Sequence, residues 1–255
     1  MSREAADPAR ELVTAARERM ALGPFLVALD FDGTLTEIDD DPEAPSLAPE
    51  RREILARVPA ARRWLAIVSG RALHDVRARI GIEGAIVVGN HGLEIEGAEV
   101  SLRLAPTGTE NRLSALLSSL PLDDAASIEE KGPTASLHVR PRGDDARHAA
   151  LGAAIRRPVE AAGFVLRPGK AVWEIRPAGA ADKGEAIRRL LHLLPGAAAE
   201  RAIYVGDDRT DEDAFLALGD GLTARVGPPA VETAARYRIP DPAAVYRFLD
   251  ELLRS

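Results

Sequence analysis

Four short aliphatic runs restrict this 255-residue chain to a small set of architectures. Each run lacks polar alternation and ends in glycine or a polar residue, which is typical of strands buried on both faces of a parallel sheet. The runs are FLVALDFDG (25–33), WLAIVSG (64–70), AIVVGN (85–90) and AIYVGDD (202–208). Segments with apolar residues at helical spacing lie between them. The pattern therefore predicts an α/β fold built on a parallel sheet.

The middle of the chain, residues 109–176, departs from this alternation. Its order is helix, two strands, helix and two strands, and Pro158 is expected to kink the second helix. Ahead of this segment, LEIEGAEVSLRL (93–104) alternates around the turn EGAE and is predicted to form a hairpin that leads out of the core. We therefore predict an α/β core formed by residues 1–104 and 180–255, with an inserted α+β domain over 105–179.

Composition excludes several classes of protein. The chain has 33 Lys and Arg residues against 40 Asp and Glu residues, a net charge of −7, so nucleic acid is not an expected partner. The absence of cysteine excludes disulfides, thiolate metal sites and a cysteine nucleophile. The charged N-terminus lacks a signal-peptide pattern, and no apolar run reaches the ~18 residues of a membrane span. We therefore expect a cytoplasmic protein without a membrane partner.

Acidic and polar side chains follow all four predicted strands at their carboxyl ends. These residues are Asp30, Asp32, Ser69, Asn90, Asp207, Asp208 and Asp211. Loops at the carboxyl ends of parallel strands meet at one edge of the sheet, where ligands bind. Carboxylates gathered there repel one another unless a cation neutralises them, and a donor set made only of oxygens suits Mg²⁺. The sequence therefore predicts a magnesium site.

The segment DFDGT at the end of the first run offers two carboxylates for two chemical roles. Extended geometry places Asp30 and Asp32 on the same side of the chain. One carboxylate can attack phosphorus, and the other can protonate the leaving oxygen and later activate water. Gly33 lets the backbone approach a phosphate, while Ser69 and Lys183 can donate hydrogen bonds or positive charge to it. These residues indicate phosphoryl transfer.

Other interpretations of the acidic segment fit less well. An EF-hand loop would need glycine at its sixth position, where Leu35 stands, and the sequence lacks the glycine patterns of P-loop and dinucleotide-binding proteins. A D-x-D-G segment alone is often a simple turn. Its occurrence in order with SGR, DKG and GDDRTDED favours a functional site.

In these motifs the chain resembles the haloacid dehalogenase (HAD) superfamily and, within it, the trehalose-6-phosphate phosphatase family. The superfamily motifs correspond to DFDGTLT (30–36), VSGR (68–71), DKG (182–184) and GDDRTDEDAF (206–215). The signatures of the phosphatase family correspond to GNHG (89–92), IEEKG (128–132), LHVR (137–140) and GKAVWEIRP (169–177). The resemblance implies a HAD-like Rossmannoid core with an inserted C2-type cap.

The resemblance also implies roles for the acidic residues. Asp30 would be the nucleophile, and Asp32 would be the general acid and base. Mg²⁺ would be held by the Asp30 carboxylate, the Asp32 carbonyl oxygen and Asp207. Asp208 and Asp211 would bind the metal directly or through water.

The remaining matched positions would contact the substrate. Those that would hold the phosphoryl group are Ser69, Lys183, Gly33 and Thr34. Those that would face the sugar are Asn90 and His91 in the core and Glu129, Lys131, Arg140, Lys170 and Glu174 in the cap. Arg71 is a further substrate-binding candidate, but its position is equally compatible with pairing to a carboxylate or capping the strand loop. The chain departs from the family pattern at Thr36, Glu37, Glu130 and Val139, which leaves the fine substrate preference open.

Together these observations predict Mg²⁺-dependent hydrolysis of trehalose 6-phosphate through an aspartyl-phosphate, in trehalose biosynthesis. An alternative within the same chemistry is a phosphatase of another disaccharide or of a glycosyl-polyol phosphate. An alternative from another class is a catalytically silent regulator that binds sugar phosphates. The expected partner is a small-molecule sugar phosphate, and association with a trehalose-phosphate synthase stays open.

Overall fold

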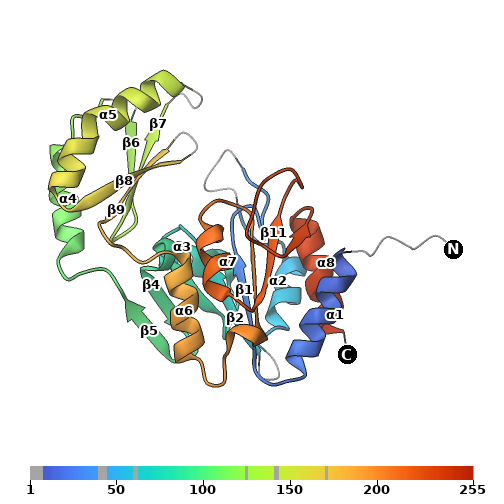
Figure 1. The fold of residues 1–255 in the computed structure, drawn as a ribbon. Coiled ribbons are helices and arrows are strands. Elements are labelled where there is room, and N and C mark those ends of the chain that lie inside the picture. Colours follow the sequence, from blue (N-terminus) through green and yellow to red (C-terminus); the bar gives the residue numbers. More distant parts are fainter. Residues whose placement is uncertain are drawn as a thin grey trace. The chain divides into compact units, whose positions relative to one another are not determined.

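The chain divides into two compact units (Figure 1). The computed structural model describes residues 8–39, 45–59, 63–123, 126–140, 144–169 and 172–254. The major unit comprises Met1–Leu102 and Ala181–Ser255, and the inserted unit comprises Arg103–Ala180. No helix in the described ranges is long and apolar enough to cross a membrane.

The major unit is built on a sheet whose central strands run parallel, as predicted. β1 (Phe25–Asp30) pairs with β10 (Ala202–Gly206) on one side and with β2 (Arg63–Val68) on the other. β1 and β10 are buried along their whole length, which confirms that the aliphatic runs form strands covered on both faces. The order within the described residues is β12-β11-β10-β1-β2-β3-β4-β5, completed by β3 (Ile86–Gly89), β4 (Glu94–Gly97), β5 (Val100–Arg103), β11 (Leu222–Val226) and β12 (Tyr237–Ile239).

The two edges of this sheet differ. At one edge β11 and β12 continue the parallel order beyond β10, an extension that the sequence patterns do not identify. At the other edge β4 pairs antiparallel with β3 and is followed by its neighbour β5. Ala98 and Glu99, which join β4 to β5, have positive φ angles of 49° and 65°, the geometry of a tight two-residue hairpin turn. The predicted hairpin is therefore confirmed.

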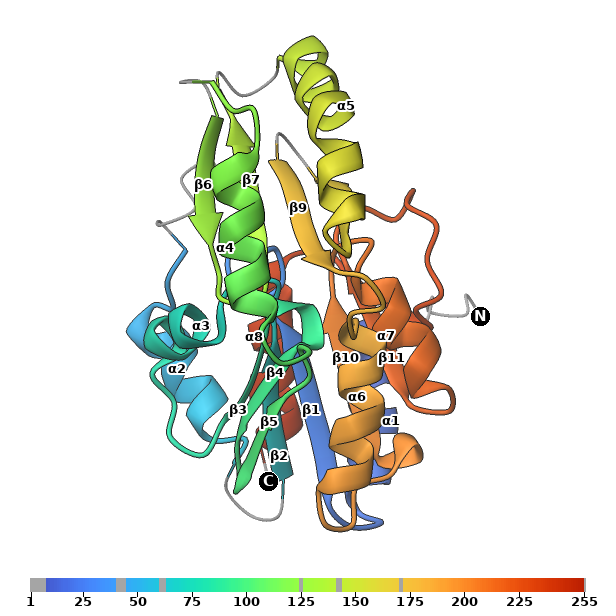
Figure 2. The same cartoon turned by 90° about the vertical axis from the view of Figure 1, so that its left-hand side faces the viewer.

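Helices cover both faces of the sheet because each has one apolar side. One face packs against α1 (Pro8–Met20), α2 (Pro49–Ala56), α3 (Leu73–Ile80) and α8 (Pro242–Leu253). The other face packs against α6 (Lys183–Leu193) and α7 (Asp211–Leu218), which lie side by side (Figure 2). The α6–α7 pair carries predicted site residues at its amino-terminal ends, Lys183 and Asp211.

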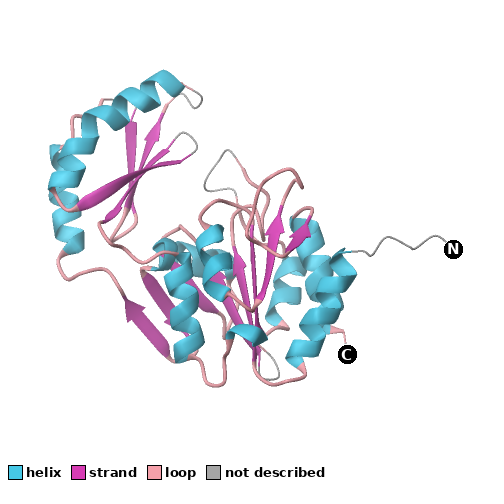
Figure 3. Ribbon diagram, viewed as in Figure 1, coloured by secondary structure: helices cyan, strands magenta, loops and turns pink. Residues whose placement is uncertain are grey.

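The inserted unit has the predicted order of helix, two strands, helix and two strands. Its antiparallel sheet has the order β6-β7-β9-β8, with α4 and α5 packed along one face (Figure 3). Leu113 of α4 and Ile155 of α5 share one buried cluster with Leu137 and Trp173 of the sheet. The elements are α4 (Thr109–Ser119), β6 (Ala126–Glu130), β7 (Ala135–Val139), α5 (Asp145–Ala161, with Pro158 inside it), β8 (Phe164–Gly169) and β9 (Val172–Pro177).

Candidate active site

The carboxyl ends of neighbouring parallel strands bring the predicted residues of the major unit together. Asp30 is the last residue of β1 and is buried, and Asp207 directly follows β10, the neighbour of β1. Ser69 follows β2 on the other side of β1, and its amide donates to the Val88 carbonyl oxygen at 2.9 Å. The strand order therefore explains why residues almost 180 positions apart share one site.

Lys183 is the cation of this site. Its Nζ donates to Asp30 Oδ1 at 2.9 Å and to Asp211 Oδ1 at 2.7 Å, and it lies 3.9 Å from Asp208 Oδ1. Its side chain is only 3% exposed. Although burial by itself lowers the pKa of an ammonium group, the charges of Asp211 and Asp30 raise the pKa of Lys183 well above its ordinary value. Lys183 therefore stays charged at the site.

Local structure explains why Lys183 stands at this place. Asp182 caps α6, since its side chain accepts a hydrogen bond from the Glu185 amide at 2.8 Å. Gly184, the residue after Lys183, lies against α7: a Cβ added there would come within 2.4 Å of the Asp213 carbonyl oxygen. The three letters DKG thus encode a cap, a buried cation and a close helix contact.

Asp211, the first residue of α7, organises the loop that follows β10. Its Oδ1 accepts from the Tyr204 hydroxyl at 2.6 Å as well as from Lys183. Its Oδ2 accepts from the amides of Asp207 and Asp208, both at 2.9 Å. Both carboxylate oxygens are thus engaged by the protein, and the side chain is fully buried. Asp211 therefore fixes the loop that carries Asp207 and Asp208.

Tyr204 is a site residue that the sequence reasoning does not identify. It lies within β10, where its ring belongs to the apolar core and its hydroxyl reaches Asp211. The sequence feature that could have identified Tyr204 is a single hydroxyl group in an otherwise apolar buried strand. A buried tyrosine needs a hydrogen-bond partner for its O–H group.

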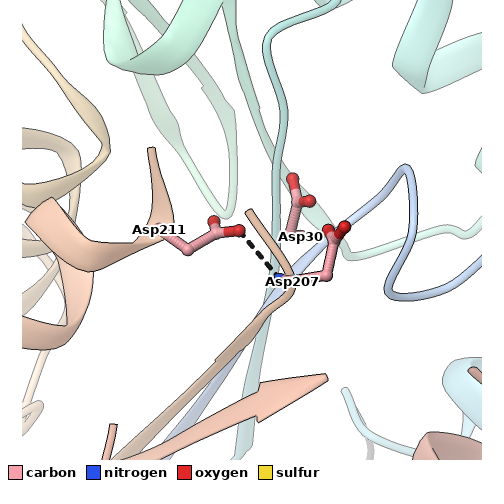
Figure 4. Close-up of side chains that lie close together, drawn as sticks. All are labelled: Asp30, Asp207 and Asp211. Carbon is pink, nitrogen blue, oxygen red and sulfur yellow. Dashed lines mark hydrogen bonds between the residues drawn. The ribbon is translucent and has the colours of Figure 1, made fainter. Parts of the chain in front are cut away.

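The carboxylates Asp30, Asp207 and Asp211 form a cluster that could hold a metal ion (Figure 4). One oxygen from each lies within 4.8 Å of the others. Burial and then the Asp211 charge raise the pKa of Asp30 well above its ordinary value, and the same two causes raise the pKa of Asp207 to about 6. Lys183 therefore does not by itself neutralise the negative charge of these carboxylates. Their oxygen atoms are the kind of ligand that a divalent cation such as Mg²⁺ prefers.

Gly33 and Thr34 place the DFDGT segment against Asp207. Gly33 has a φ of +77°, and a Cβ at this position would lie 2.2 Å from Asp207 Oδ2. The Thr34 hydroxyl lies 3.4 Å from Asp207 Oδ1. Glycine is required here both for its backbone conformation and for the close approach of the carboxylate.

Asp32 makes a different contact from the other carboxylates. Arg71 donates to it through two parallel hydrogen bonds, from Nε to Oδ2 at 2.8 Å and from Nη2 to Oδ1 at 2.7 Å. Of the alternatives that the sequence leaves open for Arg71, the structure shows the one in which it pairs with a carboxylate.

The loop after β3 brings Asn90 and His91 next to the β2 loop. The Asn90 amide donates to the Arg71 carbonyl oxygen at 2.8 Å, and the His91 amide donates to that of Ser69 at 2.9 Å. Asn90 and His91 are buried and have positive φ angles of 50° and 56°, which are uncommon for residues with side chains. The Asn90 side chain donates to Glu94 Oε2 at 2.6 Å. Such strained conformations cluster at functional sites.

Two of the predicted sugar-facing residues of the inserted unit, Glu129 and Glu174, lie on the sheet face opposite its apolar cluster. In the strand register Glu129 is opposite Ser136, Ser136 is opposite Glu174, and Glu174 is opposite Arg167. Residues directly opposite one another share a face, so these form one polar row across the sheet.

Charged groups of this row pair with neighbouring residues. Lys131 Nζ lies 3.9 Å from Glu174 Oε1, and His138 Nε2 lies 2.9 Å from Glu129 Oε2. Arg140 is exposed directly after β7, and Lys170 lies outside the described residues. The structure thus brings Glu129, Lys131 and Glu174 together on one unit.

Comparisons with known sequences agree with this geometry. The trehalose-phosphatase family model matches residues 28–236. A trehalose-phosphate phosphatase of Mycobacterium tuberculosis is 35% identical over 254 residues, and the match covers 90% of this chain and 61% of that protein's length. Trehalose-phosphate phosphatase B of Arabidopsis thaliana is 31% identical over 263 residues, with coverage of 95% and 69%.

Solved structures show the same fold. The C-terminal domain of the C. albicans trehalose-6-phosphate phosphatase has a TM-score of 0.78 at 23% identity, covering 97% of both chains. A trehalose-6-phosphate phosphatase related protein has a TM-score of 0.72 at 25% identity, covering 88% of this chain and 95% of the other. The fold is thus the HAD-like α/β fold expected from the motifs, and with the family model matching over most of its length, the chain belongs to the trehalose-phosphatase family.

Proposed function

We propose that this chain hydrolyses trehalose 6-phosphate to trehalose and phosphate in a Mg²⁺-dependent reaction. The observation that carries the proposal is Asp30, a buried carboxylate at the end of β1 that lies 2.9 Å from Lys183 and within the acidic cluster. Membership of the trehalose-phosphatase family supports this substrate among phosphate esters.

In the proposed first step, the Asp30 carboxylate attacks phosphorus while the bond from phosphorus to the sugar oxygen breaks. Asp32 gives its proton to the leaving sugar oxygen. In the second step Asp32 takes a proton from water, whose oxygen attacks the phosphorus of the aspartyl-phosphate. Phosphate leaves and the Asp30 carboxylate is regenerated.

Charge and hydrogen bonds would stabilise the phosphoryl group during both steps. Lys183 is already fixed beside Asp30, so its charge requires no rearrangement when the transition state forms. Ser69 and the backbone at Gly33 and Thr34 are the proposed hydrogen-bond donors to the phosphoryl oxygens.

The residues present fit a bound Mg²⁺ ion. Asp30, Asp207 and the Asp32 carbonyl oxygen would hold it, and Asp208 would contribute directly or through water. Asp211 would act by holding the loop of Asp207 and Asp208, because its own oxygens accept from their amides. Bound Mg²⁺ supplies positive charge for the phosphoryl oxygens and orients the phosphate for in-line attack.

Recognition of the sugar is proposed to come from the inserted unit through Glu129, Lys131, Glu174, Arg140 and Lys170, and from Asn90 and His91 of the major unit. Polar residues that form hydrogen bonds to sugar hydroxyl groups discriminate strongly against ligands without those hydroxyl groups. Contacts remote from the reacting phosphorus can be used to raise kcat/KM for the true substrate.

The test is phosphate release from trehalose 6-phosphate, glucose 6-phosphate and an aryl phosphate by the wild type, Glu129→Ala and Lys131→Ala. We expect kcat/KM for trehalose 6-phosphate to fall about 10- to 1,000-fold in both variants. The aryl phosphate is the control, since it has no sugar hydroxyls for these residues to bind and should react slowly and almost equally with all three proteins. Equal losses on all three esters would show that the two residues are structural. A wild type that releases no phosphate from any ester would favour the silent regulator.

A further inference from the structure

Arg71 and Asp32 form a two-pronged ion pair between the loops that follow β2 and β1. The guanidinium Nε and Nη2 donate to different oxygens of the same carboxylate, at 2.8 and 2.7 Å. A fork of this kind fixes the plane and the direction of the carboxylate, which a single hydrogen bond would not do. The Asp32 side chain is 39% exposed, so packing alone holds it loosely.

The guanidinium is itself held in place from other sides. Its Nη1 donates to Asp75 Oδ2 of α3 at 3.3 Å, and its carbon lies 5.9 Å from the centroid of the Phe31 ring. The Arg71 side chain is 15% exposed, far less than that of Asp32. The more rigid member of the pair is therefore the arginine.

The backbone of Arg71 is also fixed. Its amide donates to Ser69 Oγ at 3.1 Å, and its carbonyl oxygen accepts from the Asn90 amide at 2.8 Å. The residue therefore connects the loops that follow β1, β2 and β3, and a displacement of any of these loops would move the Asp32 carboxylate.

We propose that Arg71 is a positioning residue for Asp32 and does not bind the substrate phosphate. Its three guanidinium nitrogens all donate to carboxylates, two to Asp32 and one to Asp75. A phosphate group that took these donors would leave the Asp32 carboxylate without its fork beside a dianion, whereas Asp75 would keep its pair with Arg79. The proposal rests on the proposed function, in which Asp32 moves protons to the leaving oxygen and from water.

Positioning has a large kinetic effect because proton transfer requires hydrogen-bond distance to the reacting oxygen. A misplacement of about 1 Å can cost on the order of 10²-fold in rate. Loss of the fork should therefore lower kcat while leaving the affinity for the phosphate ester nearly unchanged.

The experiment compares Arg71→Gln, Asp32→Asn and the double variant on the sugar phosphate that the wild type hydrolyses best. We expect Arg71→Gln to lower kcat about 10- to 100-fold, with KM and the inhibition constant of inorganic phosphate changed less than about threefold. In the Asp32→Asn background the same substitution should change kcat less than about threefold, because the group on which it acts is already gone.

Two further variants make the result specific. Arg71→Lys keeps the charge but not the fork, so it should recover only part of the kcat that Arg71→Gln loses. Arg77→Gln removes an arginine of α3, the helix that begins two residues after Arg71. Arg77 pairs with Glu96, and its loss should leave kcat within about threefold of the wild type. If Arg71→Gln does not fold by circular dichroism, Arg71→Lys replaces it in the cycle with Asp32→Asn.

The proposal is overturned if the losses of Arg71→Gln and Asp32→Asn multiply in the double variant, or if Arg71→Gln raises KM and weakens phosphate inhibition tenfold or more. Either result would assign Arg71 to the substrate phosphate. The cycle does not depend on which sugar phosphate is used. If trehalose 6-phosphate is not hydrolysed but another sugar phosphate is, the proposed substrate fails and the test of Arg71 still stands.

Discussion

Asp30 combines the most reactive role in the proposed mechanism with an unfavourable electrostatic position. Burial and the neighbouring charges of Asp211 and Asp207 raise its pKa, and Lys183 offsets this only in part. The ionised side chain is therefore held in the folded protein at a cost in stability. Such a conflict between stability and activity is common at catalytic sites.

Replacing Asp30 with Asn tests the effect of this carboxylate on both activity and stability. Asn keeps the size of the side chain and an oxygen that can accept from Lys183, but it cannot attack phosphorus. We expect kcat to fall at least about 10³-fold. Because the substitution removes a repelled charge, the thermal midpoint Tm at pH 7.5 without metal should equal or exceed that of the wild type. A variant that keeps a tenth of the wild-type kcat would contradict the covalent mechanism.

At the scale of secondary structure, helix starts position the charged groups of the site. α6 begins at Lys183 behind the Asp182 cap, and α7 begins at Asp211, whose side chain binds the loop preceding it. α8 has an equivalent cap in Asp241, whose side chain accepts from the Ala244 amide at 2.7 Å. An aspartate N-cap is therefore present both on α6, which carries Lys183, and on α8, which contributes no proposed site residue.

Asp182→Ala and Asp241→Ala form a matched pair of cap deletions. Each should lower the free energy of unfolding by about 0.5–2 kcal/mol, since each leaves a helix amide without its acceptor. Only Asp182→Ala should also lower kcat, by about tenfold or more, because the first turn of α6 carries Lys183. Urea unfolding and phosphate release at saturating substrate measure the two effects. Equal kcat values for the two variants would show that the α6 cap does not position the cation.

At the scale of the whole molecule, the acidic cluster links stability to pH and to metal. The pKa of Asp207 is raised to about 6 by burial first and then by Asp211 and Asp208. A carboxyl group whose pKa is higher in the folded than in the unfolded state stabilises the fold when protonated. That contribution is present at low pH and is lost as the pH rises through about 6. Bound Mg²⁺ competes with the same protons.

Thermal melts at pH 5 and pH 7.5, with and without Mg²⁺, test this linkage. We expect Mg²⁺ to raise Tm at pH 7.5 and to have a much smaller effect at pH 5, where Asp207 is protonated. Histidines also titrate between pH 5 and pH 7.5, and the variant Asp207→Asn separates their contribution from that of Asp207. This variant should lose most of the Mg²⁺ effect on Tm at pH 7.5. A Tm shift that is the same at both pH values would show that Mg²⁺ does not bind at these carboxylates.

The sequence by itself determines the parts of this protein that depend on short-range pattern. Strands buried on both faces must be apolar along nearly their whole length, so the run ending at Asp30 identifies β1. Polar residues at or directly after the ends of such strands must lie at the carboxyl edge of the sheet, which is why Asp30, Ser69 and Asp207 could be assigned to one site. The helical and strand periodicities of residues 109–176 likewise predict the order of elements in the inserted unit.

The tertiary structure decides which of these groups contact one another. Asp32 pairs with Arg71, which is 39 residues away, and Tyr204 pairs with Asp211 although its own strand looks purely structural. The strand β12 has three residues, too few to show a periodicity, and only its pairing with β11 defines it. The physical reason is that burial and periodicity act over a few neighbouring residues. Hydrogen-bond partners and pKa shifts depend on which strands become neighbours in the folded sheet.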